Sequence, residues 1–216
     1  MEETLLYVVL PYAALVAWIV VPLCRLARPA VGAPARLPAA RRPLPWTLRY
    51  GLALLLAGHL LALILPRQVA LVGRQPWGLL ALEGSAFAVG GLALVGFVGM
   101  LAAYGQGSRP APLAETLLGT LVVLALLAGL AGALIYRWSS AWYTATVVPY
   151  VDSLLRLRPD PSLIAELPPL VRLHVLSGIA AIATAPFTRW GRLPRRLAPR
   201  WRLGVFARRQ GSGVSG

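Results

Sequence analysis

Charged residues are scarce in this chain of 216 residues, and lysine is absent altogether. All 21 basic residues are arginine, only 7 residues are acidic, and charged residues make up 13% of the chain. A soluble domain keeps about a quarter of its residues charged, so that its surface stays hydrated. The composition therefore excludes a water-soluble globule.

Cysteine and histidine are also rare, and this limits the chemistry that the chain can carry. The single cysteine, Cys24, excludes an internal disulfide and a cluster of cysteine ligands. His59 and His174 are the only histidines, so any metal site has few protein ligands. The sequence contains no Ser/His/Asp grouping, no metalloprotease motif and none of the inverted repeats of a transporter. Neither hydrolysis nor transport is therefore supported.

Apolar residues are abundant: they make up 58% of the chain, and the mean hydropathy is +0.70. A run of about 20 apolar residues is long enough to cross about 30 Å of hydrocarbon. Five such runs are present, at 5–24, 46–66, 79–104, 116–136 and 168–187. The sequence therefore predicts an all-α integral membrane protein, a bundle of five transmembrane helices within residues 1–209, followed by a flexible Gly/Ser-rich tail at 210–216. Small residues in the third and fourth runs favour close helix packing: Gly91, Gly96, Gly99, Ala125, Gly129 and Gly132.

The arginines are divided unequally between the two sides of this predicted bundle. Fifteen fall in the first loop with the foot of the second run, in the third loop and in the C-terminal tail, and six fall on the other side. An excess of arginine in loops marks the cytoplasmic side, so the N-terminus is expected outside and the C-terminus in the cytoplasm. The acidic start Met1-Glu2-Glu3 agrees, because a signal peptide begins with a basic segment. The net charge of +14 thus indicates a basic platform for partner subunits or membrane lipid, and no nucleic acid is expected as a partner.

The two histidines are expected at the same depth in the membrane. His59 lies seven residues before the end of the second run and His174 six residues after the start of the fifth, roughly 10 Å and 9 Å from the outer boundary at 1.5 Å per residue. Ionisable groups inside a membrane are costly and tend to mark function. Two imidazoles at one level fit a haem iron held from both faces, a hydrogen bond from each histidine to the backbone, or a proton relay. Gly58, beside His59, leaves room for a flat macrocycle.

The segment 137–189 is the most distinctive part of the sequence. It contains P-D-P-S-L-I-A from Pro159, R-L-H ending at His174, and P-F-T-R from Pro186, and the second run carries Gly-His followed by Pro66. These motifs, with the five-span layout, closely resemble the cytochrome b (gamma) subunit of membrane-bound respiratory nitrate reductase. The resemblance covers residues 1 to about 200.

The resemblance implies a function in electron transfer, for anaerobic respiration or nitrate assimilation. Such a subunit oxidises menaquinol or ubiquinol near the outer face of a bacterial or archaeal cytoplasmic (inner) membrane. It passes the electrons inward through haem b to an iron–sulfur (beta) subunit and then to a molybdenum catalytic (alpha) subunit. The chain itself has no domain that could reduce nitrate, so it is expected to serve as the quinol-oxidising subunit of a nitrate reductase.

The resemblance also implies a set of haem ligands, of which half are missing. Members of the family use four histidines to hold an outer and an inner haem, and His59 and His174 match the outer pair. At the two positions of the inner pair, this chain has Arg49 and Arg192. Arginine stays protonated and offers no lone pair to iron. We therefore expect one haem b, with His59 and His174 as axial ligands. Arg49 and Arg192 are expected to extend to the inner head groups, or else to bind a haem propionate or an acidic partner.

Glu83 is the only acidic residue well inside a predicted apolar run. Oxidation of quinol releases protons, and a carboxylate near the outer haem can accept one. Glu83 also lies near a polar quinol-site position of the family. The alternative is a charge that faces the outer head groups near a helix N-terminus, where the helix dipole favours it.

Two other functions remain open at this point. One is a haem-free membrane anchor for soluble partners, and the other is a quinone-linked cytochrome b of another reductase, such as a sulfur-cycle or heterodisulfide enzyme. A visible spectrum distinguishes the first of these, and the identity of the co-purifying subunits distinguishes the second.

Overall fold

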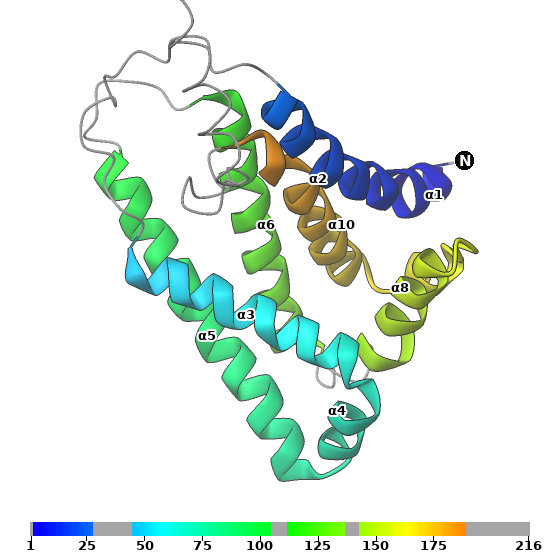
Figure 1. Cartoon of the computed structure of the whole chain (residues 1–216). Coiled ribbons are helices and arrows are strands. Elements are labelled where there is room, and N and C mark those ends of the chain that lie inside the picture. Colours follow the sequence, from blue (N-terminus) through cyan, green and yellow to red (C-terminus); the bar gives the residue numbers. More distant parts are fainter. Residues whose placement is uncertain (1, 28–44, 105–111, 137–142, 189–216) are drawn as a thin grey trace, which may run out of the picture.

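A computed structural model describes residues 2–27, 45–104, 112–136 and 143–188 of the chain (Figure 1). Within these ranges every regular element is helical. The elements are α1 (Glu2–Thr4), η1 (Leu5–Val9), α2 (Leu10–Ala27), α3 (Trp46–Ile64), α4 (Pro66–Gly73), α5 (Pro76–Tyr104), α6 (Leu113–Ile135), η2 (Tyr143–Val147), α8 (Val148–Leu155), α9 (Ser162–Ala165), α10 (Pro169–Thr184) and η3 (Ala185–Phe187). The predicted tail at 210–216 lies outside the described residues.

Five of the helical segments are long and apolar enough to cross a membrane, as the hydropathy pattern predicts. They are Glu2–Arg25, Trp46–Ile64, Pro76–Ala102, Leu113–Ile135 and Pro169–Phe187. Many large apolar side chains on these helices point outward, with Leu56 57% and Val95 68% exposed. Outward-facing apolar residues are stable in lipid, because the hydrocarbon takes the place of a protein core. The chain is thus a multi-pass membrane protein whose described regular elements are all helical.

The spans pack in two antiparallel pairs, α3 on α5 and α6 on α10, which meet where α5 contacts α6 (Figure 1). The N-terminal helix α2 lies against α10 on the far side of the second pair. Glycine allows the closest approach in the first pair: the Cβ of Ala93 lies 2.8 Å from where a Cβ on Gly51 would stand. A Cβ on Gly96 would come still closer to the backbone nitrogen of Leu48. Small residues at helix contacts are typical of membrane bundles, where close backbone packing replaces the hydrophobic effect.

The segment between the fourth and fifth spans folds into a cap at the end of the bundle where the N-terminal residues lie (Figure 1). Its buried core is formed by Tyr150, Ile164 and Leu167 together with Tyr7 of the N-terminal helix. The Tyr150 hydroxyl donates to the Tyr7 carbonyl at 2.7 Å. Burial, followed by the neighbouring tyrosines, raises the pKa of Tyr150 to about 12, so the phenol remains a hydrogen-bond donor at neutral pH.

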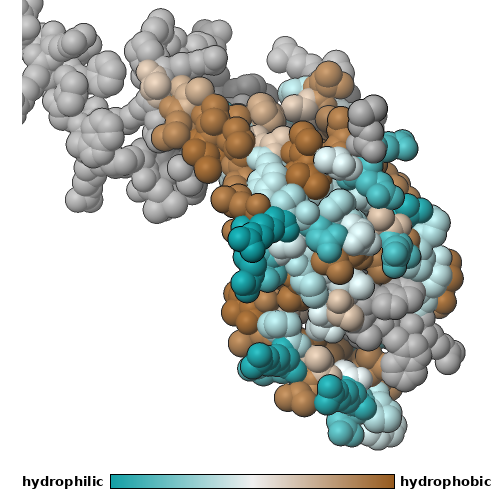
Figure 2. Space-filling view, turned by 90° about the vertical axis from the view of Figure 1, so that its right-hand side faces the viewer, coloured by the Kyte–Doolittle hydropathy of each residue, from teal (hydrophilic) through white to brown (hydrophobic). Residues whose placement is uncertain are grey.

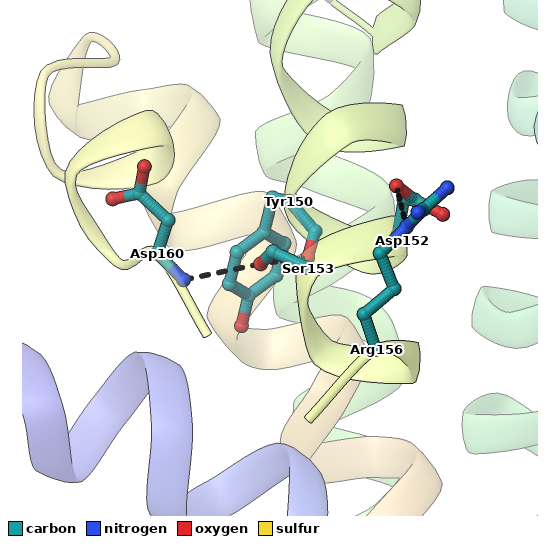
Figure 3. A network of polar contacts seen from close by, with 5 residues as sticks. All are labelled: Tyr150, Asp152, Ser153, Arg156 and Asp160. Carbon is teal, nitrogen blue, oxygen red and sulfur yellow. Dashed lines mark hydrogen bonds and ion pairs between the residues drawn. The ribbon is translucent and has the colours of Figure 1, made fainter. Parts of the chain in front are cut away.

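Polar contacts hold the turn of this cap (Figure 3). The Ser153 hydroxyl donates to the Tyr150 carbonyl at 2.7 Å and accepts from the Asp160 amide at 3.1 Å. Arg156 pairs with Asp152 one turn earlier, at 2.7 Å, on the exposed side of α8.

The face that includes this end of the bundle displays many hydrophilic residues, whereas apolar residues dominate the upper part of the same view (Figure 2).

The glycine contacts of the α3–α5 pair lead to a test on a single helix. Replacing Gly96 with alanine would bring a Cβ against the Leu48 backbone nitrogen, whereas nothing in the described structure lies within 4 Å of a Cβ at Gly99. We expect Gly96→Ala to destabilise the protein by about 1–3 kcal/mol through overpacking, and thereby to lower its unfolding temperature in detergent. Gly99→Ala is the control, because it brings the same gain in helix propensity without the collision. Equal unfolding temperatures for the two variants would contradict the packing described above.

Candidate functional site

His59 lies in the last third of α3, on a face that other protein side chains leave largely open. Its Nδ1 is 2.8 Å from the carbonyl oxygen of Leu55, one turn earlier in the same helix. A carbonyl can only accept, so Nδ1 carries the proton in this contact. The other ring nitrogen, Nε2, then has a free lone pair.

His174 lies in the second turn of α10 and is half-buried against α6. Its Nδ1 is 2.8 Å from the Ala125 carbonyl oxygen of α6, so this nitrogen also carries its proton. The imidazole ring rests on Gly129: a Cβ at that position would stand 2.9 Å from Nδ1 and from Cε1. The contact between the His174 ring and α6 therefore requires glycine at position 129.

The two imidazoles face each other across the bundle, with ring centres 6.0 Å apart and ring planes inclined by 33°. A bond from a metal to an imidazole nitrogen is about 2 Å long and the ring centre lies about 1 Å behind that nitrogen, so two imidazoles on one metal ion have centres about 6 Å apart. In addition, both rings are held by Nδ1 hydrogen bonds, the arrangement in which a metal-ligating histidine is usually fixed. The pair thus has the spacing and the tautomers of two axial ligands.

The chemistry of the surrounding residues agrees with a macrocycle better than with a metal ion bound by side chains alone. The described residues contain no group of three or more His, Cys, Asp or Glu side chains that could hold an ion. A haem needs only two protein ligands, because the porphyrin supplies the others. Nothing described lies within 4 Å of a Cβ placed at Gly58, next to His59, or at Gly178, one turn after His174. The residues present therefore fit haem.

Tyr143 completes the surroundings of His59, and sequence reasoning did not find it. Its hydroxyl donates to the His59 carbonyl at 2.8 Å, and its ring meets the imidazole edge-on, with centres 5.6 Å apart. Burial raises the pKa of Tyr143, which favours the protonated, donating phenol. The residue lies in η2, 84 positions after His59 and outside the apolar runs, so no spacing in the sequence connects the two.

Glu83 is half-buried in α5, on the same face as Leu79, Gly90 and Ala93, which are buried or partly buried in the bundle. Gly51 lies against Ala93 and Gly96 against Leu48, which sets the antiparallel register of α3 and α5. If this register continues along both helices, Glu83 lies opposite Leu61 of α3. Leu61 is two residues, or about 3 Å along the helix axis, from His59. The register thus puts Glu83 at about the level of His59 along the bundle.

Of the two arginines at the expected inner ligand positions, the structure describes only Arg49. Arg49 is exposed near the start of α3; its guanidinium lies over the Tyr50 ring, 4.7 Å from the centre, and donates to the Tyr50 hydroxyl at 3.1 Å. Arg192 lies outside the described residues. Arg49 is thus held by a neighbouring aromatic ring at the opposite end of the helix from His59.

Comparison with known proteins gives one family. The model of the family described as "nitrate reductase gamma subunit" matches residues 3–191, which include both histidines, Glu83 and Arg49. No curated protein matches the chain. Since the family match extends over most of the chain, it bears out the resemblance inferred from the sequence motifs. The chain belongs to the nitrate reductase gamma subunit family, whose members are membrane subunits of an oxidoreductase complex.

Proposed function

We propose that this chain is the haem b subunit of a membrane-bound nitrate reductase, in which it oxidises quinol and passes single electrons to the other subunits. The observation that supports this most directly is the His59–His174 pair, with ring centres 6.0 Å apart and each Nδ1 hydrogen-bonded to a carbonyl. A haem-free anchor would have no need for two imidazoles fixed in this way inside a membrane, where unpaired polar groups are costly. A quinone-linked cytochrome b of another reductase is the alternative, and the co-purifying subunits distinguish it.

The residues of the chain hold and tune this site. When bound, haem b supplies an iron that alternates between two oxidation states. His59 and His174 would hold that iron through Nε2, and the carbonyls of Leu55 and Ala125, which contact Nδ1 of each ring, would orient the rings and increase their basicity. Tyr143 fixes the His59 segment from the cap, and Gly129 gives the His174 ring its place on α6.

The stoichiometry that we propose is one haem per chain. The chain has only two histidines, and both belong to the described pair. Arg49 and Arg192 occupy the expected positions of an inner pair and cannot ligate iron, because guanidinium has no free lone pair. Electrons that go inward therefore need a centre from another subunit, unless they leave on the outer side.

The orientation and partners follow from the charge distribution and from the family. The arginine-rich first loop and tail favour a C-terminus in the cytoplasm of a bacterial or archaeal cell and an N-terminus outside, and this is the orientation that we propose. The partners are then an iron–sulfur and a molybdenum subunit on the cytoplasmic side, and menaquinol or ubiquinol within the membrane.

Haem content tests the proposed function directly. We expect a pyridine haemochrome assay on the purified complex to give one haem b per chain, and reduction to give the sharp alpha band of bis-histidine ligation. His59→Ala and His174→Ala should each abolish that band, whereas Leu61→Ala, an exposed position on the same helix, should retain it. Two haems per chain would contradict the stoichiometry, and an unchanged alpha band in both histidine variants would contradict the ligand assignment.

The contact between the His174 ring and Gly129 gives a second test, with a control on the same helix. In Gly129→Ala the new methyl group would collide with the imidazole, whereas no described atom lies within 4 Å of a Cβ at Gly132. We expect Gly129→Ala to lose most of the haem or to shift its midpoint potential, and Gly132→Ala to keep both. These quantities are measured by the haemochrome assay and by redox titration of the alpha band. Wild-type haem content and potential in Gly129→Ala would remove Gly129 from the site.

We also propose Glu83 as the proton acceptor in quinol oxidation, because this half-buried residue of α5 lies at about the level of His59. A positioned base contributes about 100-fold or more to the rate of a proton-transfer step. Glu83→Gln should therefore slow the reduction of haem by quinol about 100-fold while leaving the haem spectrum intact, as measured by stopped-flow absorbance. Glu115→Gln, in the first turn of α6, is the matched control and should keep the wild-type rate. An unchanged rate in Glu83→Gln would remove this residue from the mechanism.

A further inference from the structure

A cavity of about 350 Å³ lies between the start of the N-terminal helix and the first turns of α10, away from the histidine pair. Its polar wall contains Glu2, Glu3 and Arg172, and its apolar wall contains Leu6 and Leu176. The volume is within the range of small-molecule sites, about 300–1,000 Å³. Since Arg172 and His174 are two residues apart on a helix, their side chains leave α10 on nearly opposite sides. The cavity is therefore separate from the proposed haem site.

Arg172 is the one basic residue among those that line this cavity. Its guanidinium lies beside the Tyr7 hydroxyl. Its Nε is enclosed by the protein and has no hydrogen-bond partner, so a ligand in the cavity can meet Arg172 only through the other guanidinium nitrogens. Neither Glu2 nor Glu3 forms an ion pair with Arg172 in the described structure. Groups of both signs thus line the same cavity without forming a direct ion pair.

The position of the cavity points to the membrane interface. Glu2 and Glu3 form the first turn of the N-terminal span, and Arg172 lies three residues, about 5 Å, after the first residue of α10. Charged groups at the ends of spans lie at the depth of the lipid head groups. Leu6 and Leu176 line the same cavity farther along their helices, as the start of an acyl chain would require.

We propose that this cavity binds the head group of a phospholipid that carries a primary ammonium, such as phosphatidylethanolamine. The phosphate accepts hydrogen bonds from Arg172, whose planar guanidinium suits phosphate geometry. The ammonium donates to Glu2 and Glu3. Phosphatidylcholine has no N–H to donate, and phosphatidylglycerol brings a negative charge without a cation to meet the carboxylates. The ligand chemistry therefore distinguishes among the three common neutral and acidic head groups.

The test measures lipid selectivity on the purified, delipidated complex. Native mass spectrometry counts the lipids bound when dioleoyl-phosphatidylethanolamine, dioleoyl-phosphatidylcholine or dioleoyl-phosphatidylglycerol is titrated in. We expect one phosphatidylethanolamine to bind about tenfold more tightly than either competitor. Arg172→Gln should remove this tenfold preference, because it removes the charge-assisted bond to phosphate. Arg156→Gln is the control, since Arg156 is exposed on α8 and pairs with Asp152, and it should keep the preference.

A second variant keeps the proposal open to refutation if Arg172→Gln does not fold. The double variant Glu2→Gln/Glu3→Gln should bind phosphatidylglycerol about as well as phosphatidylethanolamine, because the repulsion from the carboxylates is gone. Equal binding of all three lipids by the wild type, or an unchanged preference in the double variant, would overturn the proposal. Displacement of the lipid by soluble phosphoethanolamine at equal concentration would also overturn it, because the leucine wall would then contribute nothing. The alpha band of haem, recorded on each sample, separates these outcomes from a failure of the proposed haem function.

Discussion

The hydrogen bond from His174 Nδ1 to the Ala125 carbonyl, at 2.8 Å, is the interaction on which the arrangement of the site depends. An imidazole inside a membrane needs a partner, because no water is present to satisfy its N–H group. The partner lies on another helix and can be reached only because Gly129 has no side chain. The α6–α10 contact is the most extensive between any two described helices, so the ring is fixed by a large interface. This contact turns the ring toward α3 and leaves Nε2 free to act as a ligand.

Tyrosine hydroxyls connect the cap to the bundle in a similar way. Tyr150 donates to the Tyr7 carbonyl, Tyr12 donates to the Leu154 carbonyl, and Tyr143 donates to the His59 carbonyl. Each joins a residue of the cap to a residue of a membrane span far away in the sequence. Because a backbone carbonyl has a fixed position in a helix, these bonds set the register of the cap against both α2 and α3. The cap thereby links the two sides of the bundle whose histidines face each other.

The parts of the structure that depend on lengths along a helix could be predicted from the sequence. The thickness of the hydrocarbon fixes the length of a span, so the five apolar runs locate the five helices to within a few residues. The fixed rise per residue places His59 and His174 at one level, and the structure brings their rings within 6.0 Å. The position of Tyr143 beside His59 depends on how the cap folds back, and the role of Gly129 depends on which face of α6 meets α10. Neither arrangement is encoded in a local spacing, so both required the structure.

The chemistry that the structure describes is concentrated at one end of the bundle. His59 lies five residues before the end of α3, and His174 lies five residues after the start of α10. The cavity that Arg172 lines lies beside the first turns of α10. Arg49, in contrast, lies near the other end of α3, ten residues or about 15 Å along the axis from His59. A second pair of histidines would divide that length into two shorter steps, but the chain has no further histidine to supply one. If one haem is held at the His59 level, as proposed above, electrons that go to the arginine-rich side would need an acceptor that a partner brings into the membrane; otherwise they would leave at the end where they enter. On that proposal the route of the electrons depends on Arg49 as well as on the histidine pair, because an arginine at this position leaves no ligand for a second iron.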